Sequence, residues 1–467
     1  MPIDPKKHFE TLLGDLPLLL QPSVSLWLER VQERDPDALP AILDTPIADT
    51  RLLQMVATSE YAANMLTRHW AWFADQARSG ALDTALQIDW SCLSQDADEA
   101  SFGQQLRSLR NRGLLHVLWR ELAGNAPLHE TLSSLSSLAD GLIAACEGYA
   151  RRQLCERFGE MRDSDGQAIP LCIMAMGKLG GRELNFSSDV DIIFLYPRDG
   201  DSDGARSLSA QEYFTRLSRR IVSLLETPTA DGFVYRVDTR LRPFGDSGPP
   251  VVSFAALESY LLNHGRSWER YAYIKSRVIV PATSDASVTA LRKELIEPFV
   301  YRRYLDFGIF ESLREMKALI TVEVQRREMA NNVKLGPGGI REIEFIAQSL
   351  QLVRGGRVRG LRCRGLQRAL RQLADLHDLR REEAAGLLDS YAFLRRLENF
   401  IQAVRDQQTH ELPDNGIDKA RLTLAMAYPD WESLATEIQR HRDFVSARFA
   451  TVAFRGESGS GSTDLRE

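Results

Sequence analysis

The sequence has few cysteines, and their spacing does not pair them. Five cysteines are spread over 467 residues without the C-x-x-C spacing of zinc or redox sites. Apolar runs are short, since LPLLL at Leu16–Leu20 is far below the roughly 20 residues that cross a bilayer. Acidic residues interrupt the opening stretch MPIDPKKHFETLLGDLP, which therefore does not resemble a signal peptide. We expect reduced cysteines, no membrane partner and a cytoplasmic location.

Positive charge is in the minority. Lys and Arg number 58 against 64 Asp and Glu, which gives a formal net charge of −6. Domains that bind nucleic acid are usually strongly basic, so this class is disfavoured. The hydrophobic fraction of 44% and the charged fraction of 26% are typical of folded globular proteins. At ~150 residues per domain, the length predicts roughly three domains.

Apolar periodicity divides the chain into four parts. Helical spacing over residues 1–150 predicts an N-terminal helical domain. Short β-rich segments between Gly-rich loops mark a catalytic α/β unit over 151–290, and helical spacing returns over 291–455. The Gly/Ser-rich end, 456–467, predicts a flexible tail or linker. The fold class predicted is α+β, a mainly helical protein whose helical domains flank a central sheet domain.

Three segments of the central unit have the composition of strands. They are Leu171–Met176, Asp189–Tyr196 and Phe233–Leu241. In an extended strand alternate side chains share a face, so Asp189 and Asp191 point the same way, about 7 Å apart along the chain. The sequence therefore presents two carboxylates together.

Two converging carboxylates repel each other and need a proton or a positive charge between them. Unit charges ~4 Å apart repel by about 4 kcal/mol at an effective dielectric near 20, which favours a proton, a cation or a metal between them. Oxygen ligands suit Mg²⁺ or Mn²⁺, so Asp189 and Asp191 are candidate metal ligands. Asp at the start of a strand is also ordinary turn chemistry, and this alternative stays open for the pair alone.

Small residues stand immediately before the Asp pair. Gly180 and Gly181 would let backbone N–H groups approach a phosphate, and the hydroxyls of Ser187 and Ser188 could add donors. These four residues are candidates for contacts with a nucleotide.

A third carboxylate strengthens the metal hypothesis. In a strand over Phe233–Leu241, Asp238 would share one charged face with Arg236, Arg240 and the following Arg242. Two-metal phosphoryl and nucleotidyl transfer uses such carboxylate clusters, and Asp238 would complete one. Arg240 and Arg242 would then donate to phosphate, although Arg also covers apolar surface on many strands without any function.

The segments MGKLGGRELNFSSDVDIIFLYP and DGFVYRVDTRLRPFGDSGPPVVSFAALESY resemble the nucleotidyltransferase fold of DNA polymerase beta and kanamycin nucleotidyltransferase. Together with SWERYAYIKSRVI, NNVKLGPGGIREIEFIAQ and YAFLRRLENFIQAVRDQQTHELP, they resemble the glutamine synthetase adenylyltransferase/adenylyl-removing enzyme family. The resemblance implies that Asp189, Asp191 and Asp238 are catalytic and bind Mg²⁺, with Mn²⁺ as the alternative.

Members of this family carry two such modules, and this sequence contains one Ser-Asp-x-Asp module with its later Asp. The wording ELNFSSDVD resembles the N-terminal, adenylyl-removing half. The resemblance implies phosphorolysis, in which phosphate attacks the AMP–tyrosine bond of modified glutamine synthetase and releases ADP. It implies glutamine synthetase, the PII signal protein and the C-terminal adenylyltransferase half as partners. Addition of AMP from ATP and a non-catalytic PII-sensing role remain the alternatives.

Lysine is scarce beside arginine, which draws attention to two lysines. Lys178 and Lys275 are candidates to neutralise phosphate charge, and each could instead be a solvated surface residue. Glu342 and Glu344 follow a Gly-rich turn, for which a tight turn into a helix is the favoured interpretation. If these two act, we expect them to serve inter-domain packing or contact with a regulator.

Overall fold

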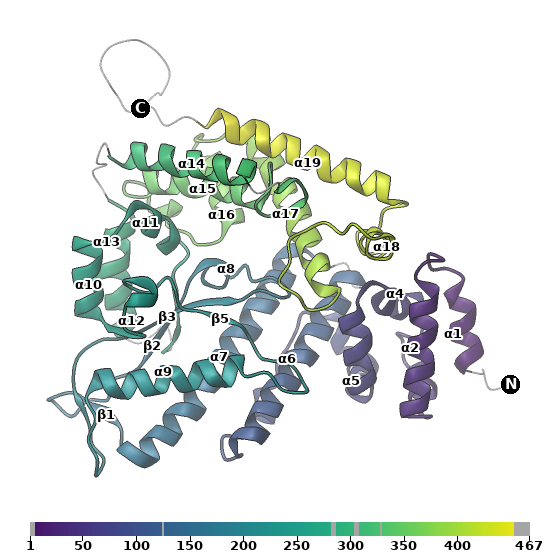
Figure 1. Cartoon of the computed structure of the whole chain (residues 1–467), viewed down its shortest axis with the longest axis horizontal. Coiled ribbons are helices and arrows are strands. Elements are labelled where there is room, and N and C mark those ends of the chain that lie inside the picture. Colours follow the sequence, from purple (N-terminus) through teal and green to yellow (C-terminus); the bar gives the residue numbers. More distant parts are fainter. Residues whose placement is uncertain (1–4, 124–125, 282–285, 303–307, 327–328, 453–467) are drawn as a thin grey trace.

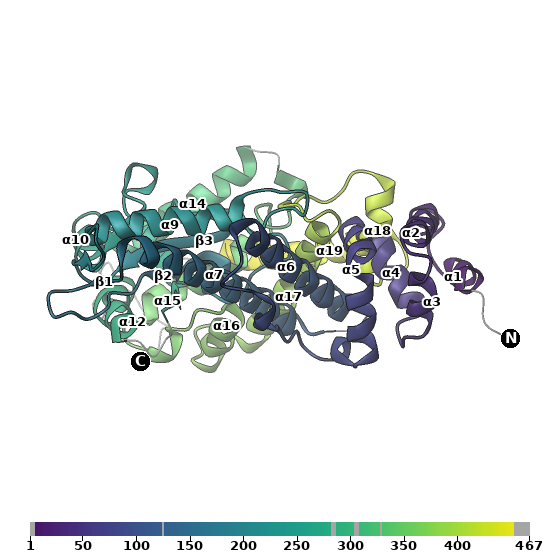
Figure 2. The same cartoon turned by 90° about the horizontal axis from the view of Figure 1, so that it is seen from below.

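The computed structural model describes residues 5–123, 126–281, 286–302, 308–326 and 329–452. The predicted tail at 456–467 lies outside the described residues. Helices predominate and surround one small mixed sheet, as the α+β expectation requires. The N-terminal helices α1–α5 lie at one end of the long axis of the molecule, and α10 lies at the other (Figures 1 and 2). None of the described helices is long and apolar enough to cross a membrane.

Seven helices precede the sheet. They are α1 (Pro5–Leu13), α2 (Gln21–Arg34), α3 (Ala38–Leu43), α4 (Thr50–Thr58), α5 (Glu60–Arg78), α6 (Glu99–Leu122) and α7 (Leu128–Phe158). Asp98 caps α6 by accepting the Ser101 N–H. Apolar residues from Leu132 to Tyr149 are buried along α7, as the helical spacing over residues 1–150 requires. This helix packs on α6 and on α9 (Ala210–Glu226), and thereby joins the N-terminal helices to the sheet.

The central sheet has five strands in the order β5-β3-β2-β7, with β6 beside β3. They are β2 (Cys172–Ala175), β3 (Val190–Tyr196), β5 (Val237–Asp238), β6 (Val251–Ser253) and β7 (Arg277–Val280). Strand β3 is antiparallel to β2 and parallel to β5 and β6, and β2 is antiparallel to β7. The small strands β1 (Met161–Arg162) and β4 (Asp201–Ser202) form a separate antiparallel pair.

The predicted strand over Phe233–Leu241 is wrong in its extent. Only Val237–Asp238 is a strand, because the chain turns directly after it. The carboxylate of Asp238 accepts the backbone N–H of Arg240 at 2.8 Å, and the N–H of Arg242 donates to the carbonyl of Thr239. Asp turns of this kind replace ladder hydrogen bonds.

The remaining helices follow in chain order. They are α8 (Gly177–Gly180), α10 (Phe254–Asn263), α11 (Ser267–Tyr273), α12 (Ala286–Ala290), α13 (Glu297–Val300), α14 (Gly308–Arg326), α15 (Ile340–Arg354), α16 (Leu366–Asp375), α17 (Arg381–Ala403), α18 (Gly416–Ala425) and α19 (Trp431–Thr451). Helices α14–α19 form a lobe above the sheet (Figure 1), which we call the C-terminal lobe.

The two faces of β3 enter different hydrophobic cores. Ile192 and Phe194 belong to the core shared with the N-terminal helices. Ile193 and Leu195 belong to the core shared with the C-terminal lobe. Because side chains alternate along a strand, Asp191 shares its face with Ile193 and Leu195. Sequence periodicity thus directs this carboxylate toward the C-terminal lobe.

Candidate active site

Asp189, Asp191 and Asp238 lie at neighbouring strand ends. Asp191 is paired with Asp238 in the parallel β3–β5 register, so the two residues are directly adjacent across the ladder. Asp189 and Asp191 line one cavity of about 220 Å³. Gly177, with φ of +52°, lies against this site, since a Cβ there would stand 2.5 Å from Asp191 Oδ2. The structure therefore brings the three predicted carboxylates to one place.

The environments of these carboxylates are unequal. Burial, followed by the charges of Asp189 and Asp238, raises the pKa of Asp191 to about 7. Hydrogen bonds from Arg240 are the main cause that lowers the pKa of Asp238. The Arg240 Nε lies 3.1 and 2.9 Å from the two Asp238 oxygens, and the Arg240 side chain is 72% exposed. Asp238 thus has a cationic partner in Arg240, whereas Asp191 is buried beside two other carboxylates.

The oxygen atoms of this trio are the donors that could hold a hard divalent cation. Across the described ranges, however, no group of three or more His, Cys, Asp or Glu side chains is arranged to hold a metal ion. Asp238 is engaged by Arg240, and Asp189 Oδ1 accepts the Gln408 Nε2–H at 2.8 Å. The chemistry of these donors suits such a cation, and Asp189 and Asp238 could bind one only after these two contacts open.

Of the four small residues predicted to contact a nucleotide, Gly180, Gly181 and Ser187 pack against or hydrogen-bond to other parts of the protein. Only Ser188 lines the cavity. The backbone N–H of Ser187 donates to Gln402, and both oxygens of Ser187 accept from Arg236. A Cβ on Gly180 would meet the Lys275 carbonyl at 1.9 Å, and one on Gly181 would lie 3.1 Å from Glu183. Both glycines therefore permit close packing behind the site, and their backbone N–H groups donate to the carbonyls of Met176 and Gly177. Their contact with a phosphate stays a prediction.

The two predicted lysines both line the cavity and differ in their partners. Lys275 Nζ lies 2.9 Å from Glu183 and 2.7 Å from Glu344 in a buried ion triad. These carboxylates raise its pKa and already pair its charge, so its contact with phosphate stays a prediction. Glu344 thereby connects α15 to the segment before β7. The favoured interpretation, a tight turn into a helix, is confirmed, since α15 begins at Ile340 directly after Gly339.

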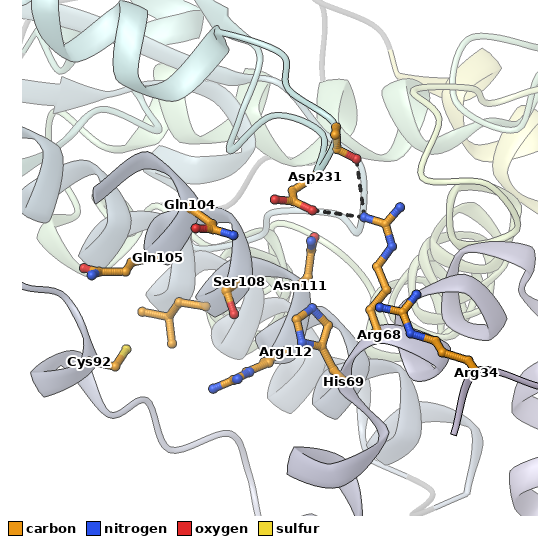
Figure 3. A pocket seen from close by; sticks show the side chains of 12 residues that line it. Arg34, Arg68, His69, Cys92, Gln104, Gln105, Ser108, Asn111, Arg112 and Asp231 are labelled. Atoms are coloured by element: carbon orange, nitrogen blue, oxygen red, sulfur yellow. Dashed lines mark hydrogen bonds and ion pairs between the residues drawn. The ribbon is translucent and has the colours of Figure 1, made fainter. Parts of the chain in front are cut away.

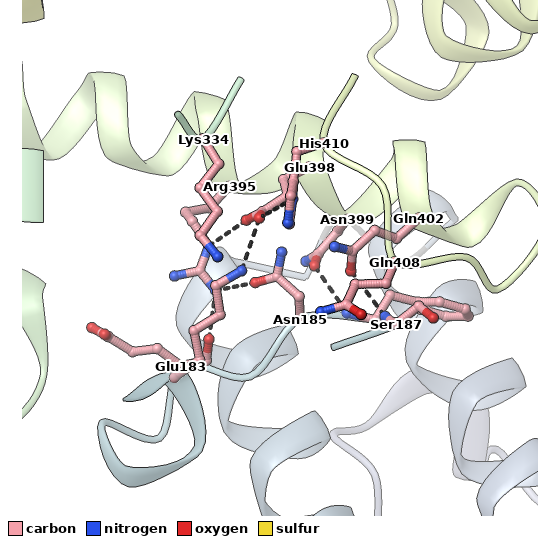
Figure 4. Close-up of polar contacts among 12 residues, drawn as sticks. Glu183, Asn185, Ser187, Lys334, Arg395, Glu398, Asn399, Gln402, Gln408 and His410 are labelled. Atoms are coloured by element: carbon pink, nitrogen blue, oxygen red, sulfur yellow. Dashed lines mark hydrogen bonds and ion pairs between the residues drawn. The ribbon is translucent and has the colours of Figure 1, made fainter. Parts of the chain in front are cut away.

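Lys178 is a better candidate for chemistry. Its Nζ lies 2.8 Å from Glu398, and burial lowers its pKa to about 8. Glu398 is fully buried on α17, between Arg395 at 3.2 Å and the His410 ring nitrogen at 2.8 Å (Figure 4). The surrounding cations hold the pKa of Glu398 well below its ordinary value. Lys178 is thus fixed beside the carboxylates by a residue of the C-terminal lobe.

The predicted phosphate-binding arginines make local contacts. Arg242 donates to the Thr239 carbonyl at 3.0 Å and to its hydroxyl at 2.7 Å, and so shapes the turn after β5. Arg240 binds Asp238 as described. Neither lines the cavity, and their contact with phosphate stays a prediction. In the structure Arg242 shapes the loop and Arg240 is the counterion of Asp238.

Sequence reasoning missed the contribution of the C-terminal lobe. Lys334, Gln348, Gln408 and His410 line the cavity opposite the strand ends. Lys334 is positioned by a turn in which Asn332 Oδ1 accepts its backbone N–H at 3.0 Å. Within the described part of the chain its ammonium has neither an ion pair nor a side-chain hydrogen bond. The N-x-K spacing before GPGG was the available signal, since it indicates a structured turn that presents a lysine.

Comparison with known proteins places this site in a family. The family model for glutamate-ammonia ligase adenylyltransferase matches residues 50–293, which include all three aspartates. The model for GlnD PII-uridylyltransferase matches residues 314–453, which include Lys334, Glu398 and His410.

Three curated relatives carry the name bifunctional glutamine synthetase adenylyltransferase/adenylyl-removing enzyme. The protein of Psychromonas ingrahamii is 42% identical over 425 residues, 89% of this chain and 44% of the relative. That of Thioalkalivibrio sulfidiphilus is 44% identical over 407 residues, 86% of this chain and 42% of the relative. That of Stenotrophomonas maltophilia is 41% identical over 446 residues, 94% of this chain and 46% of the relative. The chain spans less than half the length of these relatives, and it belongs to the glutamate-ammonia ligase adenylyltransferase family.

Proposed function

We propose that the chain removes AMP from adenylylated glutamine synthetase by Mg²⁺-dependent phosphorolysis, as the adenylyl-removing half of a bifunctional enzyme. The names of its relatives supply the substrate and the two activities. The observation that carries the proposal is the meeting of Asp189 and Asp191 with Lys178 and Lys334 in one cavity. Carboxylates there can hold a cation, and the lysines can bind the anionic phosphate.

The atoms balance in a single displacement. A phosphate oxygen forms a bond to the AMP phosphorus, the bond from phosphorus to the tyrosine oxygen breaks, and the products are ADP and a tyrosine. Mg²⁺, when bound by the aspartates, supplies Lewis-acid polarisation of the phosphorus and charge stabilisation of the leaving oxygen. Lys334 binds the incoming phosphate through its free ammonium. Lys178, with a pKa of about 8, holds a proton at Nζ that the tyrosine phenolate, of ordinary pKa ~10, can accept.

The partners follow from the same comparisons. We include the PII signal protein, because residues 314–453 match a PII-uridylyltransferase model and several of them, including Lys334 and His410, line the cavity. A partner bound to the C-terminal lobe would then act directly on Lys334 and His410. The adenylyltransferase half is the other partner, since the relatives named bifunctional are more than twice as long as the matched region.

The test incubates the chain with AMP-modified glutamine synthetase, Mg²⁺ and phosphate, and measures ADP by chromatography. Several kcal/mol of transition-state stabilisation depend on the metal, so Asp191→Asn should lower the rate at least about a hundredfold. Asp165→Asn is the matched control, because Asp165 is exposed and does not line the cavity. A second arm supplies ATP and unmodified glutamine synthetase. AMP transfer in this arm alone would overturn the proposed direction, and no product in either arm would leave a PII-sensing role.

A further inference from the structure

A second cavity, of about 630 Å³, lies among the N-terminal helices and shares no lining residue with the cavity of the aspartates. Figure 3 shows side chains converging on it from α2, α5, α6 and the turn at residues 230–231. Its residues are Arg34, Arg68, His69, Cys92, Gln104, Gln105, Ser108, Leu109, Asn111, Arg112, Ala230 and Asp231. The volume of this space is in the range of small-molecule sites.

The cavity is positively charged in a protein whose net charge is −6. Three arginines line it against one carboxylate, Asp231, which lies 3.1 Å from Arg68. Neither Arg34 nor Arg112 forms an ion pair within the described ranges. The guanidinium of Arg112 lies over the Trp72 ring at 5.6 Å, and its buried Nε has no hydrogen-bond partner in the described structure. Two arginine charges therefore remain available to an anion.

Neutral polar groups surround these charges. Gln104, Ser108 and Arg112 follow each other at four-residue spacing, so α6 presents an amide, a hydroxyl and a guanidinium along one face. Burial, with the nearby arginines Arg112 and Arg68, lowers the pKa of His69 to about 4. Its ring is therefore neutral at physiological pH, with one nitrogen donating and the other accepting. Such a lining suits a ligand with anionic groups and hydrogen-bonding atoms.

We propose that this cavity binds a small polyanion that carries phosphate or carboxylate groups. One anionic group binds between Arg34 and Arg68, and a second meets Arg112 and the polar face of α6. Binding also competes with Asp231 for Arg68. Asp231 lies in the turn that Arg107 holds through the carbonyls of Thr227 and Gly232, and this turn leads into Asp238 of β5. Asp231 thus precedes Asp238 of the aspartate site by seven positions in the chain.

The experiment is calorimetric titration of the whole chain, in EDTA, with tripolyphosphate and separately with citrate. Arg34→Gln and Arg68→Gln are suitable variants because both side chains are exposed, and the Arg68 pair with Asp231 is a weak surface contact. Charge-assisted contacts predict about tenfold weaker binding for Arg68→Gln and a larger loss for the double variant. Arg30→Gln is the matched control, since Arg30 is exposed on the same helix and does not line the cavity.

The tighter of the two probes identifies phosphate or carboxylate as the preferred group. Lys334→Gln separates the sites, because it alters the aspartate cavity alone. Binding that survives Lys334→Gln and weakens in the arginine variants supports the proposal. Binding that Arg34→Gln and Arg68→Gln leave unchanged, or the absence of heat with both probes at millimolar concentration, overturns it.

Discussion

Asp191 and Asp238 face each other across the β3–β5 ladder with their pKa values displaced in opposite directions. Burial and like charge raise the pKa of Asp191 to about 7, whereas the hydrogen bonds of Arg240 lower that of Asp238. Displacement in opposite directions is typical of carboxylates that perform different tasks in one site. Metal and proton therefore compete at Asp191 more than at Asp238.

This competition predicts a pH-dependent affinity for Mg²⁺. Below about pH 7 Asp191 is protonated, and a cation must displace the proton before it can bind. The affinity should be constant above about pH 8 and fall by up to about tenfold for each pH unit below about 6.5. Calorimetric titration with Mg²⁺ between about pH 5.5 and about pH 8.5 measures it. Asp165→Asn should follow the wild type, and an affinity independent of pH would contradict the assignment of Asp191 as a ligand.

Arg240→Gln should strengthen Mg²⁺ binding. Without a metal ion, Arg240 forms an ion pair with the Asp238 carboxylate. In Arg240→Gln, Mg²⁺ therefore no longer competes with a guanidinium for this carboxylate. Because the arginine side chain is 72% exposed, the pair is worth less than about 1 kcal/mol, which limits the gain to about fivefold. The measurement is the same titration at about pH 8, where Asp191 is ionised.

Arg216→Gln is the control for Arg240→Gln, since Arg216 forms an exposed pair with Glu212 on α9. If Arg240→Gln instead weakens binding severalfold, the arginine organises Asp238 for the metal and does not compete with it.

Lys334→Gln should raise the KM for phosphate. Its ammonium enters the cavity of Asp189 and Asp191, and loss of one charge-assisted contact predicts about a tenfold increase. Steady-state ADP formation at varied phosphate concentration measures KM and kcat separately. Lys293→Gln removes an exposed lysine outside the cavity and should leave both constants unchanged. A fall in kcat with an unchanged KM would place Lys334 at the reacting phosphorus.

Periodicity in the sequence was sufficient to find the aspartates and insufficient to assign the lysines. Alternation in extended chain predicts Asp189 and Asp191 on one face because strand geometry is local, and β3 begins directly after Asp189. The partners of Lys275 are Glu183 and Glu344, which lie far from it in sequence, so only the fold shows that its charge is already paired. Lys334 reaches the site because the C-terminal lobe packs over the sheet, a contact that no local pattern encodes. The strand at Asp238 was overestimated because turn hydrogen bonds outweighed β-propensity.

Glu398→Gln should destabilise the fold more than any surface change of the same type. The carboxylate is fully buried and pairs with Lys178, Arg395 and His410, so its neutralisation leaves buried cations without a counterion. Breaking a buried pair in this way costs about 3–5 kcal/mol. Glu212→Gln, at an exposed i,i+4 pair with Arg216, is the matched control and should cost less than about 1 kcal/mol. Thermal unfolding of both variants measures the difference.

The stability lost in Glu398→Gln should become smaller at acidic pH. The pKa of Glu398 is lowered in the folded state, so the folded protein binds fewer protons at this group than the unfolded chain in the acidic range. The contribution of the Glu398 carboxylate to the free energy of unfolding is fully present above about pH 4.5, and it is lost as the pH falls toward the folded-state pKa. The difference in Tm between wild type and Glu398→Gln should therefore narrow below about pH 4. Adding Lys178→Met to Glu398→Gln should recover part of the Tm, because one of the stranded charges is then absent; no recovery would show that Arg395 is the main partner.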